Sequence, residues 1–203
     1  MNKSTEILFN PFTRIAGQKS LILGLMIMVL TIVLAYFSNT RFDGVLGIHN
    51  GESAPFYLYI IDALTTWLSL ILIFYPISLI VTKFRSRFID VAGTFLFARF
   101  PFIIPALLMF YLRTSEVNKF LESLVTKTNI KYSISIADWM LFLASLIIMI
   151  LCTIWLVALY YKAFRVNTNL KGAKSVWVFI VGLVLAEALA SLVFYFINGS
   201  PLN

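Results

Sequence analysis

Two ionisable residues, Arg99 and Glu187, stand inside stretches of the sequence that are otherwise apolar. A charge among apolar side chains is costly to desolvate, so it pairs with an opposite charge, finds a polar partner or lines a route for ions or substrates. Three arrangements are open: an Arg99 to Glu187 ion pair, a neutral Glu187 bonded to a backbone carbonyl, and two separate water-exposed sites. The elements that carry both residues decide between them.

Two prolines, Pro101 and Pro105, follow Arg99 in the run RFPFIIPALL. Proline has no backbone N–H and clashes with the preceding turn, so the carbonyls of Phe97 and Pro101 lose their usual helical partners. Among apolar surroundings, such a break is tolerated against other helices, polar side chains or water. We therefore expect a kinked helix in the interior of a helical bundle.

Motifs for catalysis and for metal binding are missing from the sequence. The single histidine, His49, has no H-E-x-x-H context, and the single cysteine, Cys152, can form no disulfide and no cysteine-ligated metal site within the chain. The G-x-S-x-G, Walker and dinucleotide-binding patterns are also missing. We expect no catalytic residue, no metal site and no cofactor.

The composition is that of an integral membrane protein. Of 203 residues, 61% are hydrophobic and 12% are charged, against about 25% charged in soluble proteins. The net charge of +7 forms no basic stripe on a recognition motif, so the bilayer rather than nucleic acid is the expected partner. At roughly 20 apolar residues per crossing, one all-α domain of five spanning helices is predicted. These spans are residues 21–37, 57–82, 91–112, 138–161 and 175–197.

The segments between the spans predict an orientation. Lysine and arginine are concentrated before the first span and after the second and fourth, so the N-terminus is expected in the cytoplasm and the C-terminus outside. Residues 6–16 suit an interfacial lead, and residues 113–137 suit an outer loop with a short amphipathic helix. Seven bases could meet anionic lipid headgroups, although positive-inside orientation alone explains each equally well; they are Lys83, Arg85, Arg87, Lys162, Arg165, Lys171 and Lys174.

The predicted spans bring Arg99 and Glu187 within reach of each other. At 1.5 Å per residue, Arg99 lies about 12 Å and Glu187 about 18 Å from the cytoplasmic ends of their helices, a difference that the arginine side chain can cover. Three small residues on the last span recur every fourth position and allow another helix to approach closely; they are Gly182, Ala186 and Ala190.

Two further acids, Asp62 and Asp138, mark the outer ends of the second and fourth spans. An acid in the first turns of a helix favours the positive end of the helix dipole, so capping is the expected role. The alternative is that each lines an external vestibule.

Three stretches of the chain resemble the Yip-domain family. They are LFNPFTRI at 8–15, RFPFIIPALL at 99–108 and WLVALYYKAFRVNTNLKGAKS at 155–175. The resemblance spreads over nearly the whole chain, on loose, apolar motifs. It implies a compact five-helix membrane protein without an established enzymatic activity, similar to prokaryotic inner-membrane members of the family.

Three functions are compared for such a protein. The first is a non-enzymatic Yip-type protein of the bacterial inner membrane that organises the bilayer or a protein assembly. The second is a small transporter or channel subunit that uses Arg99 and Glu187. The third is an accessory subunit that docks through the Gly182 face onto a protein partner; self-association is a further alternative.

Overall fold

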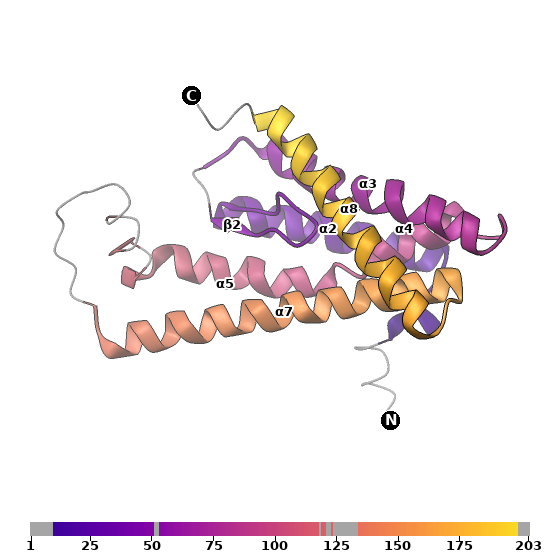
Figure 1. The fold of residues 1–203 in the computed structure, drawn as a ribbon. Coiled ribbons are helices and arrows are strands. Elements are labelled where there is room, and N and C mark those ends of the chain that lie inside the picture. The colour runs from indigo at the N-terminus through magenta and orange to yellow at the C-terminus, as the bar shows by residue number, and fades with distance from the viewer. Residues whose placement is uncertain (1–9, 51–52, 118, 121–122, 124–133, 199–203) are drawn as a thin grey trace.

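The computed structural model describes residues 10–50, 53–117, 119–120, 123 and 134–198 (Figure 1). Within these residues, five helices are long and apolar enough to cross a membrane, as predicted. Four are single helices: α2 (Gln18–Ser38), α3 (Phe56–Val81), α7 (Ile136–Thr168) and α8 (Gly172–Asn198). The third span consists of α4 (Phe88–Phe97) and α5 (Ile103–Thr114), joined through the 3-10 turn η2 (Phe100–Phe102).

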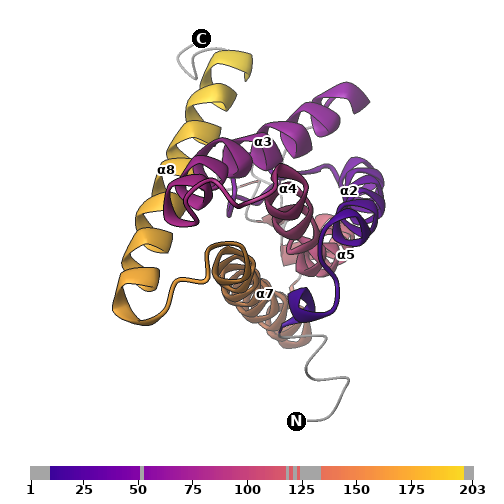
Figure 2. The ribbon, with the colours of Figure 1, turned by 90° about the vertical axis from the view of Figure 1, so that its right-hand side faces the viewer.

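The third span lies in the interior of the bundle, as its prolines predicted. The view along the bundle shows α4 between α2, α3 and α7, with α8 on the far side of α3 (Figure 2). In the third span 61% of the most apolar window is buried, against 17% to 39% in the other four spans. The pair α4 and α5 is therefore the element around which the others pack.

Two glycines allow α2 and α4 to approach closely. A Cβ atom at Gly93 would lie 2.8 Å from the backbone nitrogen of Leu21 and 2.9 Å from the carbonyl oxygen of Gly17. A Cβ atom at Gly24 would lie 2.8 Å from the backbone nitrogen of Phe97. Real side chains do not approach backbone this closely, so both positions require glycine for this packing.

The outer faces of the helices carry large apolar side chains. Exposure exceeds half of the side-chain maximum at many of them, for example Met26 (64%), Leu72 (61%), Ile147 (58%), Ile150 (61%) and Val184 (62%). Contact of this apolar surface with water is unfavourable, whereas lipid tails cover it without a cost in free energy. The surface and the helix lengths together indicate a protein that spans a membrane.

The regular α-helix of the third span is interrupted between Phe97 and Ile103, a stretch that contains Pro101. Regular α-helix ends at Phe97, and the backbone N–H of Phe102 donates to the carbonyl of Arg99 at 3.0 Å in a tighter turn. Pro101 lies inside that turn, and Pro105 is the third residue of α5, where proline is tolerated because a first-turn N–H has no helical partner. The bend expected at the two prolines stays a prediction.

The fourth spanning helix is longer than predicted. We expected it to end at residue 161, but α7 continues to Thr168, because Ala163 and Phe164 are buried and extend its inward face. It ends at Asn169, whose left-handed backbone (φ 56°) lets its N–H donate to the carbonyl of Arg165 at 2.8 Å. At 1.5 Å per residue this helix is about 50 Å long, which exceeds a hydrocarbon core of about 30 Å.

The predicted interfacial lead lies partly outside the described residues. In its described part, the turn η1 (Pro11–Thr13) buries Phe12, whose ring packs edge-on against Phe97 with centroids 6.2 Å apart. Phe12 thus belongs to the core of the bundle, and the interfacial position of this segment stays a prediction.

Most of the predicted outer amphipathic helix also lies outside the described residues. Glu116, Val117, Lys119 and Phe120 are helical, and Val117 is buried. Lys119 Nζ donates to Glu116 Oε1 at 2.8 Å, the i, i+3 contact expected on the polar side of such a helix. The ring of Phe120 packs edge-on against Trp139, with centroids 6.5 Å apart.

Candidate functional site

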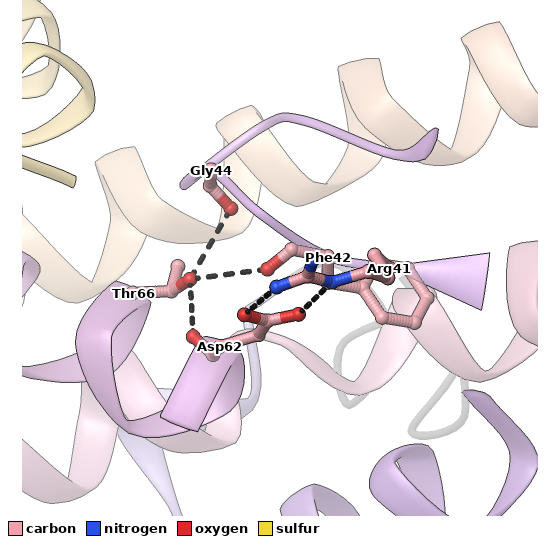
Figure 3. A network of polar contacts seen from close by, with 5 residues as sticks. All are labelled: Arg41, Phe42, Gly44, Asp62 and Thr66. Carbon is pink, nitrogen blue, oxygen red and sulfur yellow. Dashed lines mark hydrogen bonds and ion pairs between the residues drawn. The ribbon is translucent and has the colours of Figure 1, made fainter. Parts of the chain in front are cut away.

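An ion pair between Arg41 and Asp62 joins the end of α2 to the second turn of α3. Arg41 Nε donates to Asp62 Oδ2 at 2.8 Å, and Arg41 Nη2 donates to Asp62 Oδ1 at 2.7 Å, a bidentate geometry (Figure 3). The Asp62 side chain is 2% exposed and that of Arg41 is 18% exposed. The hydrogen bond from Arg41 to Asp62 raises the pKa of the guanidinium, so Arg41 stays charged.

Asp62 is therefore neither a helix cap nor an exposed vestibule residue, and the capping role expected for it is wrong. The reason is that residues 39–50 fold back over α3 and bring the base Arg41 to the carboxylate. Asp138, by contrast, has the predicted capping role. Its backbone N–H donates to Ser135 Oγ at 3.2 Å, and its carboxylate accepts the backbone N–H of Ser135 at 3.0 Å.

The ion pair stands at the neck of a loop that enters the bundle. The strands β1 (Thr40–Arg41) and β2 (His49–Asn50) pair antiparallel, and residues 42–48 between them point inward. Val45 is fully buried, and the ring of Phe42 stacks on Phe102 with centroids 4.9 Å apart. This non-helical backbone at membrane depth needs polar partners, because lipid supplies none.

Thr66 and Glu187 supply such partners. The hydroxyl of Thr66 donates to the carbonyl of Asp62 at 2.8 Å and lies 3.4 Å from the carbonyl oxygens of Phe42 and Gly44 (Figure 3). Glu187 Oε2, from α8, accepts the backbone N–H of Leu46 at 3.1 Å. The loop is thus attached to α3 on one side and to α8 on the other.

Arg99 is buried at the break of the third span, with 7% of its surface exposed. Its Nη1 atom donates to the carbonyl of Ala63 at a long 3.5 Å, and its guanidinium carbon lies 5.5 Å from the centre of the Phe102 ring. Tyr160 and Glu187 interact with it electrostatically at longer range. A hydrogen bond of this length is weak, so Arg99 is poorly compensated for its loss of water.

Arg99 and Glu187 thus hold different direct partners. Among the described residues, no hydrogen bond or ion pair joins them: Arg99 bonds to Ala63, and Glu187 bonds to Leu46. The loop 42–48, and not Arg99, provides the direct hydrogen-bond partner of Glu187. What the structure brings together is a group of polar residues around one loop, with Arg99 and Glu187 on its inner side.

A small cavity lies beside Arg99 and Asp62. Its volume is about 20 Å³, which is room for one water molecule. Apolar side chains of α2 and α3 make up most of the remaining wall, together with Tyr59, whose buried hydroxyl has no hydrogen-bond partner.

The small residues of α8 pack inside the molecule. A Cβ atom at Gly182 would lie 2.8 Å from the ring of Phe74 on α3, and Ala186 and Ala190 are fully buried. This face of α8 is already covered by α3. It does not offer the surface that an external partner would need.

The predicted headgroup-contacting bases lie at one end of the bundle, where the chain turns from α3 to α4 and from α7 to α8 (Figure 1). A cleft of about 670 Å³ includes Lys83, Arg85 and Asp90 in its wall. A neighbouring hollow of about 210 Å³ includes Lys162, Arg165 and Lys171. Arg87 and Lys174 are exposed and line neither.

Polar contacts tie the three helices together at this end. Ser78 Oγ and Ser86 Oγ are 2.8 Å apart, and Ser78 Oγ also donates to the carbonyl of Asn167 at 3.3 Å. Asn167 Nδ2 donates to Thr94 Oγ1 at 2.7 Å and to the carbonyl of Ala163 at 2.9 Å. The bases therefore stand on a connected frame of α3, α4 and α7.

Sequence reasoning missed the Arg41–Asp62 pair and the role of Thr66. A signal was present: Asp62 is the one acid among residues 57–82, and Arg41 is the one arginine or lysine among residues 38–56. Opposite charges on either side of one connection could have been paired. The inward course of the loop, which depends on packing against Phe102 and α8, had no such signal.

Comparison of the chain with protein-family models, with curated proteins and with solved structures gives no match. The resemblance to the Yip-domain family therefore rests on the three quoted stretches alone. Within the described residues, no group of three or more His, Cys, Asp or Glu side chains could hold a metal ion.

Proposed function

We propose that this protein is a non-enzymatic, multi-pass membrane protein of the Yip type that organises the bilayer or a protein assembly. The observation that supports the proposal is that the polar residues between the spans bind other parts of the same chain. Arg41, Asp62, Thr66 and Glu187 all bind other parts of the chain, and the cavity beside them has room for about one water molecule. Such an arrangement supports a rigid scaffold better than a route for a solute.

The basic end of the bundle faces the cytoplasmic leaflet of an inner membrane in this proposal. Bases on the α3–α4 and α7–α8 turns share that end, and the positive-inside rule places such an end in the cytoplasm. The third helix, kinked at Pro101 and Pro105, forms the axis about which the other spans pack. The outward partners are lipid, anionic headgroups at the basic end, and another protein or a second copy.

A small transporter or channel subunit is the second candidate, and one observation favours it. Arg99 is a buried cation with one weak direct partner, and it stands where the third span is discontinuous. Ionisable residues inside spans commonly mark ion or substrate routes, and broken helices commonly form their binding sites.

Reconstitution into liposomes separates the two candidates. Wild-type protein and the Arg99→Met variant are reconstituted, chloride and proton flux are followed with entrapped dyes, and vesicle shape is imaged by electron cryomicroscopy. The proposal predicts flux equal to that of protein-free liposomes for both proteins, together with a changed vesicle shape or a cross-linked assembly in native membranes. Flux that is present in wild type and lost in a folded Arg99→Met variant would establish the transporter instead.

A further inference from the structure

Three bases share the hollow between the end of α7 and the start of α8. Lys162 and Arg165 are three residues apart on α7, so they lie on the same helix face. The left-handed residue Asn169 then ends the helix and turns the chain back, which brings Lys171 to the same hollow. Because the helix end and the turn fix this convergence, the hollow has a defined shape and does not depend on three freely moving side chains.

Within the described residues, no acid lines this hollow, and none of the three bases has a carboxylate partner. The larger neighbouring cleft differs, because Asp90 stands there with Lys83 and Arg85. Like charges held close together repel each other unless an anion lies between them. The hollow therefore has the electrostatic character of an anion site.

Arg165 is held in place for such a role. Its guanidinium carbon lies 5.9 Å from the centre of the Tyr161 ring, one turn earlier on the helix. Stacking on an aromatic ring fixes the plane of a guanidinium and leaves its N–H groups free to donate. Lys162 and Arg165 are half-buried, so the hollow offers partly dehydrated donors, which bind an anion more strongly than fully solvated ones.

Asn10 adds an acceptor to the same hollow. Its Oδ1 atom is buried and has no hydrogen-bond partner among the described residues. A bare anion would leave that oxygen unsatisfied, whereas a group that carries hydroxyl or ammonium hydrogens beside its phosphate would satisfy it. The donor and acceptor set of the hollow thus matches a phosphate ester with a polar substituent.

The position of the hollow points to the headgroup layer. Helix α7 is about 50 Å long and must extend beyond a hydrocarbon core of about 30 Å. Trp177 on the first turns of α8 is 68% exposed, and Phe84 on the α3–α4 turn is 78% exposed. Aromatic side chains at one end of a bundle are typical of the membrane interface.

From these observations we infer that the hollow formed by Lys162, Arg165, Lys171 and Asn10 binds the phosphate of a polar phosphate ester. The lipid source is an anionic phospholipid headgroup such as that of phosphatidylglycerol, and the soluble source is a free compound such as glycerol 3-phosphate. The inference deepens the proposed function by naming a ligand for its basic face, and it rests on the chain spanning a membrane.

Native mass spectrometry of the detergent-solubilised protein tests the inference. Wild type is titrated with phosphatidylglycerol and with zwitterionic phosphatidylcholine, and glycerol 3-phosphate and inorganic phosphate are added as competitors. Lys162→Gln, Arg165→Gln and Lys171→Gln are compared with Lys19→Gln, which removes the same charge from an exposed position outside the hollow. Each hollow variant should bind phosphatidylglycerol about tenfold more weakly, and the control should change by less than about twofold.

The outcomes distinguish the sources. Selective phosphatidylglycerol binding that the soluble phosphates do not displace identifies a lipid site, and displacement by glycerol 3-phosphate identifies a soluble ligand. Equal binding of both lipids, or equal loss in Lys19→Gln and in the hollow variants, would overturn the inference. If a glutamine variant unfolds at a lower temperature than wild type, phosphatidylglycerol binding is measured on Arg165→Lys instead. Lysine keeps the positive charge but lacks the planar guanidinium. Binding in micelles is independent of vesicle shape, so this test can fail while the organising role stands.

Discussion

Arg41 and Arg99 have the same side chain in opposite surroundings. Arg41 forms two short hydrogen bonds with a buried carboxylate, whereas Arg99 is more deeply buried and has one long bond to a carbonyl. A buried charge contributes to stability when its hydrogen-bond geometry compensates for desolvation, and costs stability when it does not. The fold therefore depends on Arg41 and tolerates Arg99.

Replacing Arg99 with an apolar residue of similar length should leave the fold intact. We expect the free energy of unfolding of Arg99→Met to lie within about 1 kcal/mol of wild type or above it, because a poorly compensated charge is removed. Glu187→Gln should add its own small effect independently, since its direct partner is Leu46 and not Arg99. Denaturant unfolding in mixed micelles measures both. A large loss in Arg99→Met that Glu187→Gln restores would show a direct pair after all.

At the residue scale, the sequence predicts what is local and misses what depends on tertiary packing. The Ser135–Asp138 capping box needs four consecutive residues, and the role of Asp138 was predicted correctly. The Arg41–Asp62 pair needs the loop 42–48 to enter the bundle, which no local pattern indicates. The same loop gives Glu187 a backbone partner that the sequence could not reveal.

The spanning helices are the elements that the sequence predicts best. Their length and hydropathy are dictated by the bilayer, so five stretches of about the right length were found. Their ends are less predictable: α7 continues past residue 161 because the buried residues Ala163 and Phe164 extend its inward face beyond Lys162. Pro76 lies inside α3 without ending it, which shows that proline alone does not locate a break.

The contact between α2 and α4 makes a prediction at this scale. Gly93→Ala places a Cβ atom against backbone atoms of Gly17 and Leu21, which cannot move without shifting α2. Such overpacking typically costs about 1–3 kcal/mol, so the melting temperature in detergent should fall. Ala188→Leu, on an exposed position of α8, is the matched enlargement and should leave it unchanged. Equal melting of Gly93→Ala and wild type would contradict the close approach.

The whole molecule has one basic end and one end that carries the Arg41–Asp62 clamp and the capping box of α7. The bases follow the second and fourth spans, so the positive-inside rule predicts that the basic end faces the cytoplasm. The number of spans and this charge asymmetry follow from the sequence. The central position of α4 and the inserted loop follow from packing, which requires the structure.

Labelling of introduced cysteines tests the orientation. Cys152 is buried, so we expect little labelling of the native cysteine. Ser53→Cys, on the α2–α3 connection, should react with an impermeant maleimide in spheroplasts, because the proposed orientation places that connection outside. Arg87→Cys, on the α3–α4 turn, should react only after the membrane is opened. The reverse pattern would show the opposite orientation and would place the basic end outside.

The central claim is that polar residues between the spans hold the fold by binding the inserted loop, and the Arg41–Asp62 pair tests it most directly. The measurement is the free energy of unfolding of wild type, Arg41→Ala, Asp62→Asn and the double variant. Arg41→Ala should lose about 3 kcal/mol, because it leaves a buried carboxylate unpaired. Asp62→Asn should lose less, because Arg41 is partly exposed. The double variant should be more stable than Arg41→Ala, whereas losses that simply add would contradict the account.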